Sequence, residues 1–171
     1  MSNLTEIDKP ALLGDIIYGP GAESHNMLSR FTEEVAAMDW SFKELLGFYS
    51  GLDRPIAQEN FELFYNALER TAPPYQGGDM YLFRGTSLET LKEHGAGLCW
   101  TTSGEVANQF ANLCCSGRYQ FMGAIDKTPV VLEDYFDPDE ILYCHTNERG
   151  EQEVLLKQYC QPHNPTIHTG K

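Results

Sequence analysis

Two glutamates, Glu151 and Glu153, lead into the apolar run from Val154 to Leu156 near the end of the chain. The apolar run predicts a buried strand, and strand side chains alternate between faces, so both carboxylates would lie on one face, about 6–7 Å apart. A carboxylate beside an apolar strand is costly to desolvate unless a partner meets it. The pair suits divided roles, in which one acid stabilises a cationic transition state and the other handles an acceptor. The alternative is a strand whose first residues are exposed at the sheet edge, with both carboxylates solvated.

An arginine closes a second predicted strand. The apolar residues 80–83 are followed directly by Arg84, Gly85 and Thr86. A guanidinium is a planar, permanently charged fork that fits a phosphate or a carboxylate. The adjacent Gly85 would allow a ligand to approach the backbone closely. The alternative is a solvated strand tip followed by an ordinary turn.

A third strand carries hydroxyl groups and runs into a helix. Cys99, Trp100 and Thr101 lie in the strand, and residues 105–111 follow with helical spacing of apolar side chains. Trp100 by itself indicates a core position. Phe110, on the helix, would by itself be a core residue too.

Taken in order, these three segments resemble the arginine, serine-motif and glutamate signature of the mono-ADP-ribosyltransferases, the R-S-E class that includes cholera-like and clostridial C2-like toxins. The match runs over residues 80–157, about half of the chain. Cys99-Trp100-Thr101 aligns with the serine motif, and some bacterial and phage members carry Ser-Trp-Thr there. Cys99 replaces the first serine, and a thiol is a poorer hydrogen-bond partner than a hydroxyl.

The resemblance implies NAD+ as a substrate and no metal. Arg84 would bind the NAD diphosphate, and Gly85 would offer backbone groups to the nicotinamide amide. Thr101 would brace the site, and Phe110 would either stack on nicotinamide or belong to the core. The residues implied in cofactor binding are Arg84, Gly85, Thr86, Cys99, Trp100, Thr101 and Phe110.

The implied catalytic residues are Glu153, Glu151 and Arg84. Glu153 would accept a hydrogen bond from the ribose 2′-OH and stabilise the oxocarbenium-like transition state as nicotinamide leaves. Glu151 would serve the acceptor, and in this family a glutamate there goes with arginine as the target. The polar residues 143–150 would recognise the target, or form an ordinary hairpin loop.

Composition narrows the class of partner. The chain has 171 residues, 42% of them hydrophobic, and a net charge of −13. Such acidity argues against nucleic acid or an anionic membrane as a partner and favours a basic or arginine-bearing protein. The five cysteines are odd in number and form no C-x-x-C pair, which favours a reducing compartment. Without a spanning apolar run or a signal segment, a cytoplasmic location is expected.

The elements that must position these residues fall into one predicted domain over residues 1–171. We expect an irregular arm at 1–28, helices within 30–72 with Thr32 as an N-cap, a catalytic β core at 79–160 and a mobile tail at 161–171. An acidic stretch, 133–140, would be a solvated loop. The expected strands are 80–84, 98–102, 119–125, 130–132, 141–143 and 153–159.

This pattern predicts an α+β fold like that of the ADP-ribosyltransferases, with two packed, mainly antiparallel sheets, N-terminal helices and NAD in the cleft between the sheets. The predicted function is transfer of ADP-ribose from NAD+ to a protein arginine, by a phage or bacterial effector or toxin. The alternatives are ADP-ribosylation of nucleic acid or a small molecule, NAD glycohydrolysis, and a non-catalytic acidic protein that binds a partner.

Overall fold

The structure is a computed structural model, and it describes residues 27–51, 59–115, 127–146, 150–158, 160, 162–163 and 165–169. Contacts divide the chain into two compact units, Met1–Ala72 and Pro73–Lys171. The boundary follows α4 and lies directly before the pair Pro73-Pro74, where the helix ends because proline cannot continue it. A single domain over the whole chain stays a prediction.

The described part of the first unit is helical. Its elements are η1 (Met27–Arg30), α2 (Glu33–Ala36), α3 (Phe42–Gly51) and α4 (Phe61–Thr71). Thr32 is the N-cap of α2, as predicted, and its hydroxyl accepts a hydrogen bond from the Val35 amide at 3.4 Å. The predicted arm at 1–28 lies almost wholly outside the described residues.

The helical spacing from Phe31 to Leu46 predicts one continuous helix, but the chain forms two. Ser41 begins a second helix through a capping box: its amide donates to Glu44 Oε2 at 2.8 Å, and its hydroxyl accepts from the Glu44 amide at 3.3 Å. Trp40 fixes the break, because its indole N–H donates to the Val35 carbonyl at 2.7 Å.

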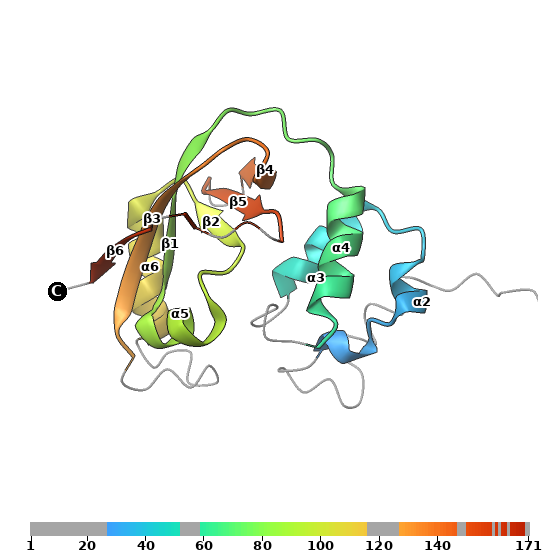
Figure 1. Cartoon of the computed structure of the whole chain (residues 1–171), viewed down its shortest axis with the longest axis horizontal. Helices are drawn as coiled ribbons and strands as arrows, with labels where there is room; N and C mark the ends of the chain where they lie inside the picture. Colours follow the sequence, from blue (N-terminus) through green and yellow to red (C-terminus); the bar gives the residue numbers. More distant parts are fainter. Residues whose placement is uncertain are drawn as a thin grey trace, which may run out of the picture. The chain divides into compact units, whose positions relative to one another are not determined.

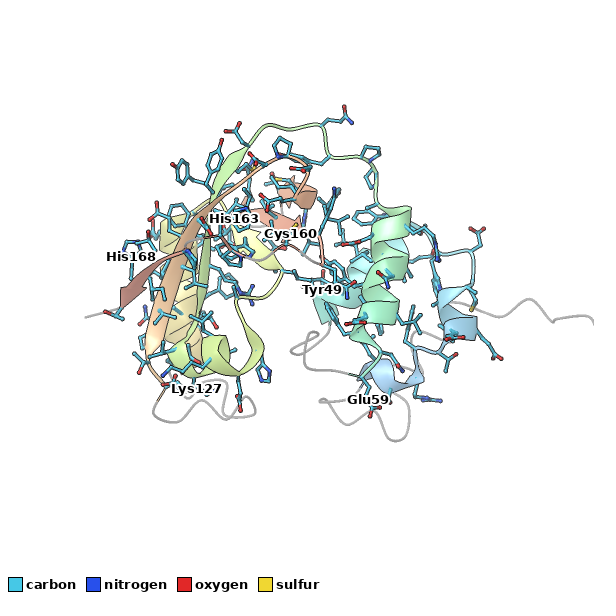
Figure 2. All side chains as sticks on the ribbon, in the orientation of Figure 1. Tyr49, Glu59, Lys127, Cys160, His163 and His168 are labelled. Carbon is cyan, nitrogen blue, oxygen red and sulfur yellow. The ribbon has the colours of Figure 1, made fainter. Side chains whose placement is uncertain are left out.

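Aromatic packing forms the core of this unit. Phe64 is fully buried, and its ring lies 5.2 Å from Phe31 and 5.3 Å from Phe48, centroid to centroid. Tyr49, labelled in Figure 2, stacks on the same ring at 6.4 Å. These edge-to-face and stacked contacts hold α3 and α4 together.

The second unit carries a six-stranded antiparallel sheet with the strand order β4-β5-β2-β1-β3-β6 (Figure 1). Its elements are β1 (Met80–Ser87), α5 (Leu88–His94), β2 (Cys99–Thr101), α6 (Gly104–Cys115), β3 (Pro129–Phe136), β4 (Ile141–Thr146), β5 (Gln152–Leu156) and β6 (Thr166–Thr169). The α+β class is therefore confirmed. The predicted strand at 119–125 lies outside the described residues.

The described strands form one sheet, so the prediction of two packed sheets is wrong for this part of the chain. The reason lies in β1, which is paired on both sides. It pairs with β3 from Met80↔Phe136 to Ser87↔Pro129, and with β2 at Phe83↔Thr101. That single register pair joins β4, β5 and β2 to β1, β3 and β6.

One face of this sheet is apolar. The Trp100 ring, 2% exposed, meets Phe136 at 5.0 Å, so the core position predicted for Trp100 is confirmed. Other fully buried side chains are Leu82, Val130, Leu132, Val154 and Leu156.

Helix α6 packs against β1 and β3 on the opposite face, and Gly85 is the reason it can approach so closely (Figure 1). A Cβ atom on Gly85 would lie 1.8 Å from the Ala107 carbonyl oxygen and 2.6 Å from the Ala111 amide nitrogen. Because both atoms belong to the backbone of α6, no side-chain rotation could make room. The close packing of α6 on β1 therefore requires glycine at position 85.

The C-terminal segment is held to β3, although a mobile tail is predicted for 161–171. Thr166–Thr169 pairs with β3 as strand β6. The labelled histidines in Figure 2 add two ion pairs: His163 Nε2 lies 2.9 Å from Glu140 Oε1, and His168 Nε2 lies 3.0 Å from Glu133 Oε2. Glu133 and Glu140, which belong to the acidic stretch predicted to be a solvated loop, thus contact the C-terminal segment.

Candidate active site

Arg84 links two strands through its side chain. Alternation along β1 directs it to the face opposite Gly85 and α6. Its Nη1 donates a hydrogen bond to the carbonyl oxygen of Cys99. Its Nε is buried and has no hydrogen-bond partner within the described part of the chain. Arg84 as a whole is partly exposed, so the remaining N–H groups of its guanidinium are suited to an anionic ligand.

Gly97 forms the surface against which the guanidinium rests. Its φ of +76° is in the left-handed region, and a Cβ there would lie 2.7 Å from Arg84 Nη2 and 2.9 Å from Cζ. The Trp100 indole N–H donates to the Gly97 carbonyl at 3.0 Å and fixes this turn. The role of Gly97 was not predicted, because no local pattern relates it to Arg84.

Arg84 and Glu153 lie on different faces of the sheet. Phe83 opposes Thr101, and Thr101 opposes Glu153, so these three side chains share a face that Arg84 does not. Phe83↔Thr101 is the backbone pair that joins β1 to β2. At Cys99 the connection to β1 is made by the Arg84 guanidinium. A ligand that contacts both Arg84 and Glu153 would therefore lie where β1 and β2 part.

Cys99 is within electrostatic reach of both charged groups. Burial raises the pKa of its thiol above the ordinary value, the Arg84 guanidinium lowers it, and the Glu153 carboxylate raises it. The net direction is upward, so the thiol is protonated at neutral pH. The residue that departs from the serine motif thus interacts electrostatically with both charged residues of the signature.

Thr101 is buried and is placed beside Glu153 by strand pairing. It is 7% exposed, and its hydroxyl accepts a hydrogen bond from the Ser103 amide at 3.2 Å. The Ser103 hydroxyl in turn accepts from the Val106 amide at 3.3 Å in the first turn of α6. Thr101 therefore fixes the passage from β2 into α6 next to the carboxylate.

His145 is the residue of this site that sequence reasoning missed. It opposes Glu153 across the β4–β5 pair, and its Nε2 lies 3.5 Å from Glu153 Oε2. Its ring stacks with Tyr143 at 5.5 Å between centroids. The antiparallel pairing of β4 with β5, in which Thr146 opposes Gln152, sets His145 opposite Glu153. No pattern along the chain indicates this pairing, because it depends on the strand register.

Three predicted cofactor residues have packing roles that need no ligand. Gly85 accommodates α6, Trp100 belongs to the core, and Thr86 is 5% exposed and opposes Val130. Phe110 differs from these, because 43% of it is exposed on α6. A core role for Phe110 is thereby excluded, and stacking on a ligand stays a prediction.

Glu151 lies one residue before β5 and is partly buried. Its predicted separation from Glu153 stays a prediction. Of the predicted target loop at 143–150, residues 143–146 belong to β4, Gly150 has a φ of +78°, and 147–149 lie outside the described residues.

A scan against models of protein families, a search of curated proteins and a search of solved structures gave no match to this chain. The resemblance to the mono-ADP-ribosyltransferases thus rests on the motif residues themselves. Among the described residues, no three His, Cys, Asp or Glu side chains are grouped to hold a metal ion. No helix in that part of the chain is long and apolar enough to cross a membrane.

Proposed function

We propose that this protein is a mono-ADP-ribosyltransferase that transfers ADP-ribose from NAD+ to a protein arginine and releases nicotinamide. The observation that supports the proposal is that Arg84 donates a hydrogen bond to the Cys99 carbonyl, while Glu153 lies opposite Thr101 in the adjacent strand pair. The three segments of the signature are thereby neighbours in one sheet. An anion-binding fork and a carboxylate acting on one residue suit a substrate that carries both a diphosphate and a developing cation.

The NAD diphosphate fits the Arg84 side chain. A guanidinium has five N–H donors. One of them is used by the Cys99 carbonyl, and because the side chain as a whole is only partly buried, its remaining donors are suited to phosphate oxygens. Gly97 leaves room for the fork, since a side chain there would collide with it.

Glu153 would act on the ribose. Its carboxylate would accept a hydrogen bond from the 2′-OH and stabilise the positive charge that develops as the bond between ribose C1′ and nicotinamide nitrogen breaks. A guanidino nitrogen of the target then bonds to C1′, and its proton passes to Glu151. The electron pair of the broken bond leaves with nicotinamide, so no metal or redox step is needed.

The charge of the chain supports a protein acceptor. At −13, the protein repels nucleic acid and attracts a surface rich in arginine or lysine. We propose a cytoplasmic target protein with such a surface, in a phage or bacterial effector or toxin setting.

A non-catalytic, acidic partner-binding protein is the alternative from a different class. Cys99 in place of a serine is the observation that favours it, because the thiol gives the carboxylate a weak hydrogen-bond partner. Such a protein would bind its partner with an affinity that falls steeply with salt and does not depend on Glu153.

The test is nicotinamide release from labelled NAD+, with and without a cell lysate, by the wild type and by Glu153→Gln. We expect labelled protein that disappears in the variant, with turnover reduced by about 10²–10³ for one lost transition-state contact. Glu105→Gln, at an exposed position on α6, removes the same charge elsewhere and should leave turnover unchanged.

The other outcomes separate the alternatives. Nicotinamide release without labelling indicates a glycohydrolase, and labelled nucleic acid or a labelled small molecule changes the acceptor class. Equal, background release by both proteins would contradict the enzyme and leave the acidic partner-binding protein.

A further inference from the structure

We propose that His145 is a positioning residue for Glu153, which holds the catalytic carboxylate in its working orientation. This inference rests on the proposed function, because it takes Glu153 as the group that stabilises the transition state. It adds a residue that the arginine, serine-motif and glutamate signature does not contain.

Strand pairing fixes the two side chains against each other. His145 on β4 is directly opposite Glu153 on β5, so their Cβ atoms are neighbours on one face of the sheet. The imidazole Nε2 lies 3.5 Å from Glu153 Oε2, and the two side chains are 28% and 35% exposed. The contact is therefore half-shielded from water, where an electrostatic interaction is screened less than at an open surface.

The imidazole ring is also held from its other side. Its plane lies 24° from that of Tyr143, with the ring centroids 5.5 Å apart. A stacked ring has few alternative orientations, so Nε2 keeps facing the carboxylate. Among the described residues, Thr101 on β2 opposes Glu153, and the Cys99 thiol interacts electrostatically with both Glu153 and Arg84.

The position of the ring proton follows from burial. Nδ1 of His145 is buried and has no hydrogen-bond partner in the part of the chain that the structure describes. A proton on Nδ1 would be a buried donor without an acceptor, which is costly. The neutral ring therefore carries its proton on Nε2, the nitrogen that faces Glu153.

An Nε2–H directed at one oxygen would restrict rotation of the carboxylate and hence the direction of its other oxygen. The ribose 2′-OH would meet that second oxygen, with no rotation of the carboxylate needed in the transition state. Support of this kind keeps a catalytic group within the narrow range of geometries in which it works. His145 itself touches neither substrate nor reacting atoms.

The test compares two substitutions in nicotinamide release from NAD+. His145→Phe keeps a ring beside Tyr143 and removes the donor, whereas His145→Gln places an amide N–H near the position of Nε2. We expect kcat to fall about 10–100-fold in the His145→Phe variant, as for loss of a hydrogen bond to a charged group. KM for NAD+ should change by less than about threefold, and His145→Gln should recover most of kcat.

His168→Phe is the matched control. It removes another histidine from a glutamate, Glu133, at 3.0 Å on the outer strand β6. Its kcat should equal that of the wild type. The positioning role would be overturned if His145→Phe left kcat unchanged or altered only KM. It would also be overturned if the kcat of His145→Gln were no higher than that of His145→Phe.

Nitrogen chemical shifts of ¹⁵N-labelled histidine give a readout that does not depend on turnover or on a variant that folds. The wild type should show the tautomer with the proton on Nε2 for His145, and a proton on Nδ1 alone would overturn the inference. If wild type and Glu153→Gln release nicotinamide equally slowly, the proposed function and the positioning role of His145 both fail. If only Glu153→Gln loses turnover and His145→Phe does not, this inference alone fails.

Discussion

The guanidinium of Arg84 donates a hydrogen bond to the backbone carbonyl of Cys99, a residue 15 positions further along the chain. This bond ties the end of the Arg-Gly segment to the start of the Cys-Trp-Thr segment, next to the Phe83↔Thr101 pair that joins β1 to β2. Arg84 is thus held in place before any ligand arrives. Pre-organisation of this kind reduces the entropy lost on binding an anion.

Gly97→Ala should weaken NAD+ binding without touching a predicted ligand residue. The new methyl would lie 2.7 Å from Arg84 Nη2 and displace the fork. The left-handed backbone adds about 1–2 kcal/mol of destabilisation. Titration calorimetry with NAD+ measures the first effect and denaturant unfolding the second. Gly78→Ala, with nothing within 4 Å, is the control, and unchanged NAD+ affinity in Gly97→Ala would contradict the role of this contact.

Gly85→Ala should be strongly destabilising whether or not the protein is an enzyme. A Cβ 1.8 Å from the Ala107 carbonyl oxygen forces α6 away from β1. Overpacking of this kind costs about 1–3 kcal/mol, and here at least the upper end is expected because backbone must move. Urea unfolding followed by circular dichroism measures it, with Gly78→Ala again as the control. If the free energy of unfolding fell by less than about 0.5 kcal/mol, α6 and β1 would be further apart than the structure places them.

The Cys99 thiol should alkylate slowly at neutral pH, and its pKa should respond to Glu153. Burial and the Glu153 carboxylate both raise the pKa of this thiol, so less thiolate is present at a given pH. Glu153→Gln removes one raising cause, and the pH midpoint of alkylation by iodoacetamide should shift downward. Mass spectrometry of the Cys99 peptide after timed alkylation of the folded protein reports it. The control variant Glu105→Gln should have the same alkylation midpoint as the wild type. An unshifted midpoint in Glu153→Gln would show that the Glu153 carboxylate does not act on Cys99.

Cys99→Ser should raise the rate of nicotinamide release. A hydroxyl is a better hydrogen-bond partner than a thiol and fits the same space, so the carboxylate and ribose gain a firmer contact. A gain of about 5–10-fold corresponds to one neutral hydrogen bond of about 1 kcal/mol. Steady-state kinetics would measure it, with Cys99→Ala as the variant that gains no donor. A serine variant no faster than wild type would show that the thiol does not limit turnover.

Glu151→Gln should separate transfer from hydrolysis. Without the carboxylate that accepts the guanidinium proton, labelling of arginine should fall by about 10²–10⁴, the range for general base catalysis. Nicotinamide release in the absence of acceptor should be largely retained, because Glu153 is intact. Parallel assays with labelled NAD+ and an arginine-rich acceptor protein compare the two rates. Equal loss of both would contradict a division of labour between the two glutamates.

Local patterns predicted the elements that depend on neighbouring residues. Alternating or continuous apolar residues indicated β1, β2 and β5, and the hydroxyl of Thr32 indicated a helix start. The core position of Trp100 was also predicted from its residue type alone. A capping box at Ser41 was also readable, but the apolar spacing that ran across it indicated one helix, and the local cap prevailed.

The tail illustrates the limit of such patterns. Thr166–Thr169 is polar and exposed, so nothing in its composition distinguishes a strand from a mobile end. It is ordered by pairing with β3 and by ion pairs to Glu133 and Glu140, which lie far away in the sequence. The choice between one sheet and two depended in the same way on β1 having partners on both edges.

By itself, the sequence determined which residue types could do chemistry: Arg84, Glu151 and Glu153, in an α+β chain with an acidic surface. The tertiary structure alone placed the Arg84 fork against Gly97, set Cys99 beside two opposite charges, and put His145 opposite Glu153. The physical reason is that strand register and the close approach of backbones are set by contacts between distant segments. Spacing along one strand or helix does not specify them.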